Sequence, residues 1–241
     1  MSAEGHNGAG GGAPGAPLVL PRRLGLEVAI VFGAQLALLV GLVRLDRAVG
    51  SGGALHALVG AVFVFLPLLV LDRRGRPYDR YGMRLGRPLG DAAWALLFMA
   101  VAFVPVALIA PHVWGVADRA WRLTLPAGYP GAALAHLVVV AGPEEFFYRG
   151  YLMGRLDDLF GARGRFLLLG ATVGPALFVQ AALFALGHFA VDLDPARLAV
   201  FFPAIAFGWL KARRGGLVAP VLFHAASNIF MDVLRAGLYL A

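Results

Sequence analysis

Residues 131–152 read GAALAHLVVVAGPEEFFYRGYL, an apolar run with two glutamates and an arginine in its second half. A helix of about 20 apolar residues spans the hydrocarbon core of a bilayer, so this run predicts a transmembrane helix. Each Glu or Arg at the centre of such a helix costs roughly 2.5–3.5 kcal/mol on insertion scales. Glu144, Glu145 and Arg149 therefore indicate a role that apolar side chains do not fill.

The rest of the chain has the composition of a membrane protein. Of its 241 residues, 60% are hydrophobic and 15% are charged. Soluble domains are about half apolar and a quarter charged. The composition and the apolar runs predict an all-α, polytopic membrane protein with about seven transmembrane helices in a bundle. An eighth helix, or a shallow helix around residues 112–126, is the alternative. The other apolar runs lie at 24–43, 54–71, 91–110, 166–189, 197–211 and 217–236.

The basic residues are distributed unevenly among the loops between these runs. Alternate segments, beginning with the N-terminal one, hold more than twice as many Arg and Lys residues as the others. The positive-inside rule then places the N-terminus in the cytoplasm. The basic residues form no patch with interleaved aromatics, which argues against nucleic-acid binding. Only Lys211 is a lysine, which is typical of a GC-rich bacterial genome, and we expect a bacterial inner (cytoplasmic) membrane.

The chain divides into three predicted parts. Residues 1–20 are rich in Gly, Ala and Pro and are expected to form a disordered tail. Residues 21–130 would supply the N-terminal transmembrane helices, and residues 131–241 the functional core. The absence of cysteine excludes disulfides and thiolate metal sites.

The spacing of the three charges separates a pair from a single acid. Glu145 and Arg149 lie at i and i+4 on a helix, with the acid N-terminal to the base, which is the favourable orientation for an ion pair. Glu144 is left over, about 100° round the helix. Burial disfavours the ionised form of a lone carboxylate, so Glu144 is a candidate proton acceptor. The alternative is a purely structural polar cluster that locks this helix to its neighbours.

Two later runs carry histidines in similar positions. FALGH (184–188) places His188 one turn after Phe184, and HAASN (224–228) places His224 and Asn228 on one helix face. A carboxylate and an imidazole can take a proton from water, and an imidazole and an amide can stabilise an oxyanion. The same Glu/His/His set could hold zinc. The chain has neither an HExxH motif nor a Ser/His/Asp order.

Other polar residues in the runs have a structural interpretation. His136 is expected to be a packing residue. Asp232 continues the stripe of His224 and Asn228, with Arg235 three residues on as its expected partner.

The three motifs EExxxR (144–149), FxxxH (184–188) and HxxxN (224–228), in this order on separate apolar runs, resemble those of the CPBP intramembrane proteases. This family includes the CaaX prenyl endopeptidases and the bacterial Abi proteins. The resemblance covers residues 131–236. It implies a bundle around an intramembrane catalytic cavity and glutamate-dependent hydrolysis without a metal. Zinc held by Glu144, His188 and His224 is the minority alternative.

The resemblance also implies a role for each motif residue. Glu144 would be the general base, and His188 would help to hold and activate the water. His224 and Asn228 would form the oxyanion site, with Glu145 and Arg149 in support.

The expected activity is an intramembrane endopeptidase that hydrolyses a peptide bond near the membrane. Its partners would be the lipid bilayer and a membrane-associated substrate, such as a C-terminal tail, a lipidated protein or a peptide. The alternatives are a non-catalytic membrane scaffold or immunity-type protein, and a proton-coupled carrier. Straight helices would place Glu144 and His188 at different depths, so we expect breaks at Gly142-Pro143 and Gly174-Pro175.

Overall fold

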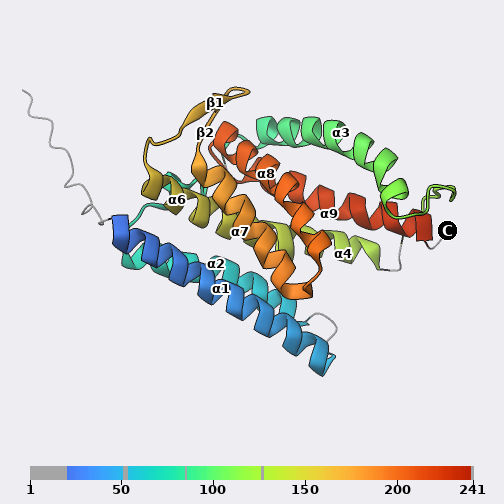
Figure 1. The fold of residues 1–241 in the computed structure, drawn as a ribbon, viewed down its shortest axis with the longest axis horizontal. Coiled ribbons are helices and arrows are strands. Elements are labelled where there is room, and N and C mark those ends of the chain that lie inside the picture. Colours follow the sequence, from blue (N-terminus) through green and yellow to red (C-terminus); the bar gives the residue numbers. More distant parts are fainter. Residues whose placement is uncertain (1–20, 51–53, 85, 126–127, 240–241) are drawn as a thin grey trace, which may run out of the picture.

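A computed structural model describes residues 21–50, 54–84, 86–125 and 128–239, and the expected tail at 1–20 lies outside these described residues. The protein is a helical bundle (Figure 1). Helices α1 and α2 pack together along one side, α3 packs on α9 along the other, and α7 and α8 lie between them. The long helices are α1 (Pro21–Val49), α2 (Ala54–Arg73), α3 (Pro88–Val113), α7 (Pro175–Asp192), α8 (Phe201–Arg214) and α9 (Val218–Tyr239).

One further helix runs without interruption from Tyr129 to Phe160. It consists of α4 (Tyr129–Ala135), the π-helical turn η2 (His136–Ala141), α5 (Gly142–Glu145), a second π-helical turn η3 (Phe146–Leu152) and α6 (Met153–Phe160). Two short 3-10 helices, η1 (Tyr78–Tyr81) and η4 (Pro195–Val200), lie in the connections.

The membrane character of the sequence is also visible in the structure. In the part of the chain that is described, three helices are long and apolar enough to cross a bilayer: Arg22–Val49, Pro88–Val113 and Pro175–Asp192. Helix α3 exposes large apolar side chains along its outer face, including Val101 and Leu108, as a lipid-facing helix does. The all-α, polytopic membrane fold is therefore confirmed.

One expectation about the helices is wrong. Residues 166–173 do not begin a helix but form an antiparallel hairpin of β1 (Phe166–Leu168) and β2 (Ala171–Val173). Leu169 and Gly170 both have positive φ, and this two-residue turn reverses the chain before α7 begins at Pro175. The alternative of a shallow helix around 112–126 is not seen in the described residues, since α3 ends at Val113 and residues 115–125 have no helical structure.

The break expected at Gly142-Pro143 takes the form of a π-helical turn. The N–H of Gly142 bonds to the carbonyl of Leu137, five residues earlier, and Pro143 has no N–H to donate. Gly60 of α2 packs against this irregular backbone, so that a Cβ at position 60 would lie 2.8 Å from the Val139 carbonyl oxygen. At Gly174-Pro175 no break inside a helix occurs, because α7 starts there.

Candidate active site

The two glutamates lie on the single α-helical turn, Gly142–Glu145, between the two π-helical turns. A π-helical turn shifts the residues that follow it round the helix and is often found at functional sites. Glu145 and Arg149 are completely buried. Glu144 keeps 17% of its side chain exposed. The adjacent acids therefore lie in different surroundings.

Glu145 Oε1 is the centre of the polar cluster. It accepts a hydrogen bond from Arg149 Nη1 at 2.8 Å and lies 2.8 Å from His224 Nδ1. The expected ion pair between Glu145 and Arg149 is present, and His224 joins it from α9. A carboxylate accepts hydrogen bonds, so Nδ1 of His224 carries a hydrogen and the ring presents Nε2 away from Glu145.

Arg149 is enclosed on its other sides by a carbonyl and by aromatic rings. Its Nη2 donates to the carbonyl of Ala204 on α8 at 3.2 Å. Its guanidinium carbon lies 4.4 Å from the ring centre of Phe184 and 4.9 Å from that of Phe207, within the range of cation–π attraction. Arg149 therefore connects its own helix with α7 and α8.

Glu144 is the acid left outside the ion pair. Its Oε2 lies 3.8 Å from His224 Nε2, which is too far for a direct hydrogen bond. Oε2 is buried and accepts no hydrogen bond from the described residues. One carboxylate oxygen and one imidazole nitrogen thus face each other across a short gap, where a polar atom such as a water oxygen can bridge them.

His188 is held by its own helix. Its Nδ1 lies 3.0 Å from the carbonyl oxygen of Phe184, so that nitrogen carries a hydrogen and Nε2 is free to accept one. The Phe184 ring lies between the two histidines, with its centre 4.4 Å from the His188 ring and 5.9 Å from the His224 ring. The FxxxH spacing thus brings both imidazoles against one aromatic side chain.

Asn228 lies one turn after His224 on α9 and is partly buried. It makes no hydrogen bond to the part of the chain that the structure describes, so its amide is not engaged in packing. Among those same residues, no three His, Asp or Glu side chains lie close enough together to hold a metal ion.

Several residues around the cluster were not found from the sequence. Gln180 is completely buried on α7 and donates to the Ala204 carbonyl that Arg149 also uses. Phe207 stacks on the His224 ring at 4.7 Å. Neither residue type has a periodic or motif signal that separates it from ordinary packing.

The prediction that Asp232 pairs with Arg235 is wrong. Its Oδ2 lies 2.7 Å from Nε2 of His136 on η2, whereas Arg235 lies over the Trp114 ring. The helix that carries Glu144 packs along α9, so a residue from the neighbouring helix reaches Asp232. The spacing of three residues between Asp232 and Arg235 on α9 therefore did not determine which residue pairs with Asp232.

Residues 126–230 match the family model described as type II CAAX prenyl endopeptidase Rce1-like. No curated protein and no solved structure matched the chain. The matched segment contains all three motifs, and the match points to a CAAX-type protease acting on a protein or peptide at the membrane. Through this segment, the integral membrane protein is similar to the type II CAAX prenyl endopeptidases of the Rce1-like family.

Proposed function

We propose that this protein is an intramembrane endopeptidase in which Glu144 is the general base that activates water. The observation that carries the proposal is the difference between the two adjacent acids. Glu145 is neutralised by Arg149 and bonded to His224, whereas Glu144 Oε2 faces His224 Nε2 at 3.8 Å and accepts no hydrogen bond from the described part of the chain. A water bound beside Oε2 could donate one hydrogen to Glu144 and keep a lone pair for attack.

The reaction needs one proton transfer in each direction. As the water oxygen bonds to the carbonyl carbon of the scissile peptide, Glu144 takes a proton and the carbonyl electrons move onto oxygen. When the C–N bond breaks, the carbonyl re-forms and Glu144 returns the proton to the leaving nitrogen. His188, with Nε2 free to accept, would hold the same water from α7.

His224 and Asn228 would stabilise the oxyanion. His224 Nδ1 already donates to Glu145, so Nε2 carries a hydrogen only when the ring is the imidazolium. In that form, Nε2 would donate one hydrogen bond to the oxyanion. The Asn228 amide, free of packing hydrogen bonds in the described part of the chain, would supply the second donor.

The reaction is proposed to need no metal, because the carboxylate and imidazoles supply both base and oxyanion donors. The substrate would be a C-terminal tail, a lipidated protein or a peptide at the membrane. The N-terminus would lie in the cytoplasm of a bacterial inner membrane. This orientation is supported by the close approach of two Arg-containing loops at one end of the bundle, where a Cβ at Gly82 would lie 3.2 Å from the Gly215 carbonyl oxygen.

The test compares isosteric changes at the two adjacent acids. Purified protein in lipid–detergent mixtures is incubated with membrane-tethered peptides that have apolar C-terminal tails, with and without a lipid group, and cleavage is followed by mass spectrometry. Glu144→Gln should lower the cleavage rate about 10²–10⁴-fold without lowering the unfolding temperature. Glu145→Gln should lower the unfolding temperature because the buried Arg149 loses its counter-ion.

Cleavage by Glu144→Gln at the wild-type rate would contradict the assignment of the base. The metal question is tested separately with EDTA. Full activity in the chelator is expected, and a loss that zinc restores would favour the zinc alternative. If the folded wild-type protein cleaves none of these peptides, the scaffold or carrier alternative is favoured.

A further inference from the structure

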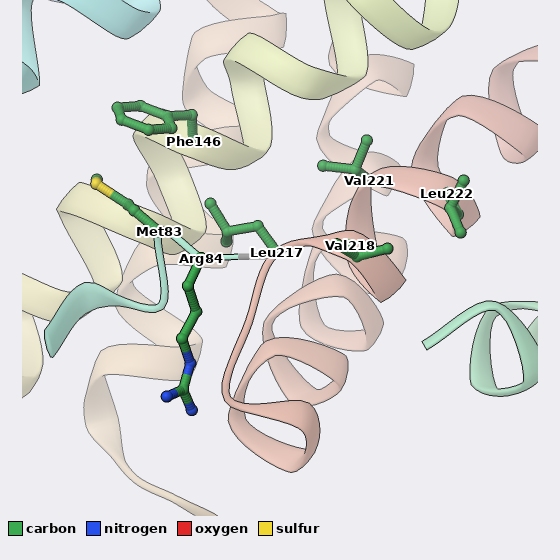
Figure 2. A pocket seen from close by; sticks show the side chains of 7 residues that line it. All are labelled: Met83, Arg84, Phe146, Leu217, Val218, Val221 and Leu222. Carbon is green, nitrogen blue, oxygen red and sulfur yellow. The ribbon is translucent and has the colours of Figure 1, made fainter. Parts of the chain in front are cut away.

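An open cavity of about 340 Å³ lies at the start of α9, lined by Phe146, which follows Glu145, and by Val221, one helical turn before His224. Its walls are apolar side chains from three segments, as Figure 2 shows. They are Met83, Phe146, Leu217, Val218, Val221 and Leu222. The volume is in the range of small-molecule sites, and among the described residues that line it only one has a polar side chain.

That residue is Arg84, which extends away from the apolar side chains in Figure 2. Its Nε donates to the carbonyl of Gly215 at 3.3 Å, which holds the guanidinium beside the α8–α9 turn. Arg84 is exposed and has no carboxylate partner among the residues that the structure describes. Most of its donors are therefore available to an anion at the edge of the cavity.

The two ends of the cavity differ in polarity. Gly215, which bonds to Arg84, lies in the turn before α9, Val218 begins the helix, and Val221 and Leu222 follow one turn further along it. The charged end is at the loops, where a membrane helix meets the headgroup region, and the apolar walls continue along α9. A ligand that fits needs an anionic group at one end and a hydrocarbon chain at the other.

The charge around the cavity favours an anionic lipid. Arg87, three residues after Arg84, is also exposed and lacks an ion-pair partner in the described chain, whereas Arg213 lies over the Trp94 ring. Unpaired arginines at helix ends attract anionic headgroups, and basic pockets between transmembrane helices bind such lipids. We propose that this cavity binds an anionic phospholipid, with its phosphate on Arg84 and one acyl chain against Val218, Val221 and Leu222.

The test measures lipid binding to the detergent-purified full chain by native mass spectrometry. The probes are dioleoyl phosphatidylglycerol, dioleoyl phosphatidylcholine and soluble glycerol phosphate, which separates a lipid site from a simple phosphate site. Phosphatidylglycerol should bind more tightly than phosphatidylcholine. Arg84→Gln should weaken phosphatidylglycerol binding about tenfold, the ratio that about 1.4 kcal/mol of lost charge-assisted hydrogen bonding gives. Val218→Phe should weaken both lipids by filling the cavity.

Arg163→Gln is the matched control, because Arg163 is an exposed loop arginine that does not line the cavity. It should leave lipid binding unchanged, and circular dichroism checks that each variant is folded. Equal losses in Arg84→Gln and Arg163→Gln would overturn the site in favour of diffuse surface charge. Competition by glycerol phosphate alone, no effect of Val218→Phe, or displacement of the lipid by a short apolar peptide with a free carboxylate would each overturn the lipid assignment.

Discussion

Two arginines on the same helix, Arg149 and Arg155, are both completely buried, yet their surroundings differ. Arg155 binds Glu27 of α1 through Nη2 at 2.5 Å and through Nε at 3.0 Å, and Asp158 through Nη1 at 3.1 Å. Arg149 binds a single carboxylate, that of Glu145, and otherwise faces a carbonyl and aromatic rings.

The charge balance of the two clusters is opposite. Around Arg155, each acid has a second guanidinium, Arg74 for Glu27 at 2.8 Å and Arg80 for Asp158 at 2.6 Å. Positive charge is in excess there, and both acids are paired with arginines. Around Arg149 there are two acids and one guanidinium, and only Glu145 is paired with it, while Glu144 stays outside the pair. The first cluster is suited to joining helices and the second to holding a reactive carboxylate.

The largest loss of stability is expected when the Arg149 cluster is disrupted. Arg149→Gln leaves Glu145 completely buried without its guanidinium, and breaking a buried pair from one side typically costs about 3–5 kcal/mol. Thermal and denaturant unfolding in detergent should show a loss of that size, together with loss of cleavage. A variant as stable as the wild type would mean that His224 alone compensates Glu145.

Arg155→Gln should cost less, about 2–3 kcal/mol, although Arg155 makes more ionic contacts than Arg149. Glu27 keeps Arg74 and Asp158 keeps Arg80, so neither acid is left without a counter-ion. The same unfolding measurement serves both variants. A larger loss in Arg155→Gln than in Arg149→Gln would reverse the comparison and assign the main structural role to the Arg155 cluster.

The contrast between these clusters also shows which contacts could be predicted from the sequence. The Glu145–Arg149 pair was predictable because helical periodicity brings residues four apart together, whatever the fold around them. The bond from His224 to Glu145 joins residues 79 apart in the sequence. It depends on how α9 packs, which spacing along one helix does not determine.

The same limit applies to the fold. Apolar runs predicted every long helix, because burial in lipid requires length and hydrophobicity. They failed at residues 166–173, where an apolar segment has the same composition as a helix but reverses at Leu169 and Gly170. The π-helical turns beside Glu144 were predicted only as a break at Gly142-Pro143, since proline shows where a helix is disturbed and not how.

A smaller loss of stability is expected for substitutions beside the π-helical turns, and it should differ between the two turns. Gly60→Ala would bring a Cβ to 2.8 Å from the Val139 carbonyl, a backbone atom that cannot move aside, and should cost roughly 1–2 kcal/mol. Gly150 lies in the second turn, where the nearest atom to a new Cβ is the flexible end of Met83 at 2.9 Å. Gly150→Ala should therefore be nearly neutral, helped by the better helix propensity of alanine. Equal losses in the two variants would mean that the first turn is no more constrained than the second.

The smallest effect concerns the other polar tie between the Glu144 helix and α9. His136 and Asp232 are joined at 2.7 Å, but their side chains are 24% and 42% exposed, so solvent screens the pair. Asp232→Asn should cost about 0.5–1 kcal/mol and leave cleavage within about twofold of the wild type. The comparison is with Glu145→Gln, whose acid also pairs with a histidine across these two helices but is completely buried. If Asp232→Asn instead lost cleavage at unchanged stability, the reactive region would extend along α9 from His224 through Asn228 to Asp232.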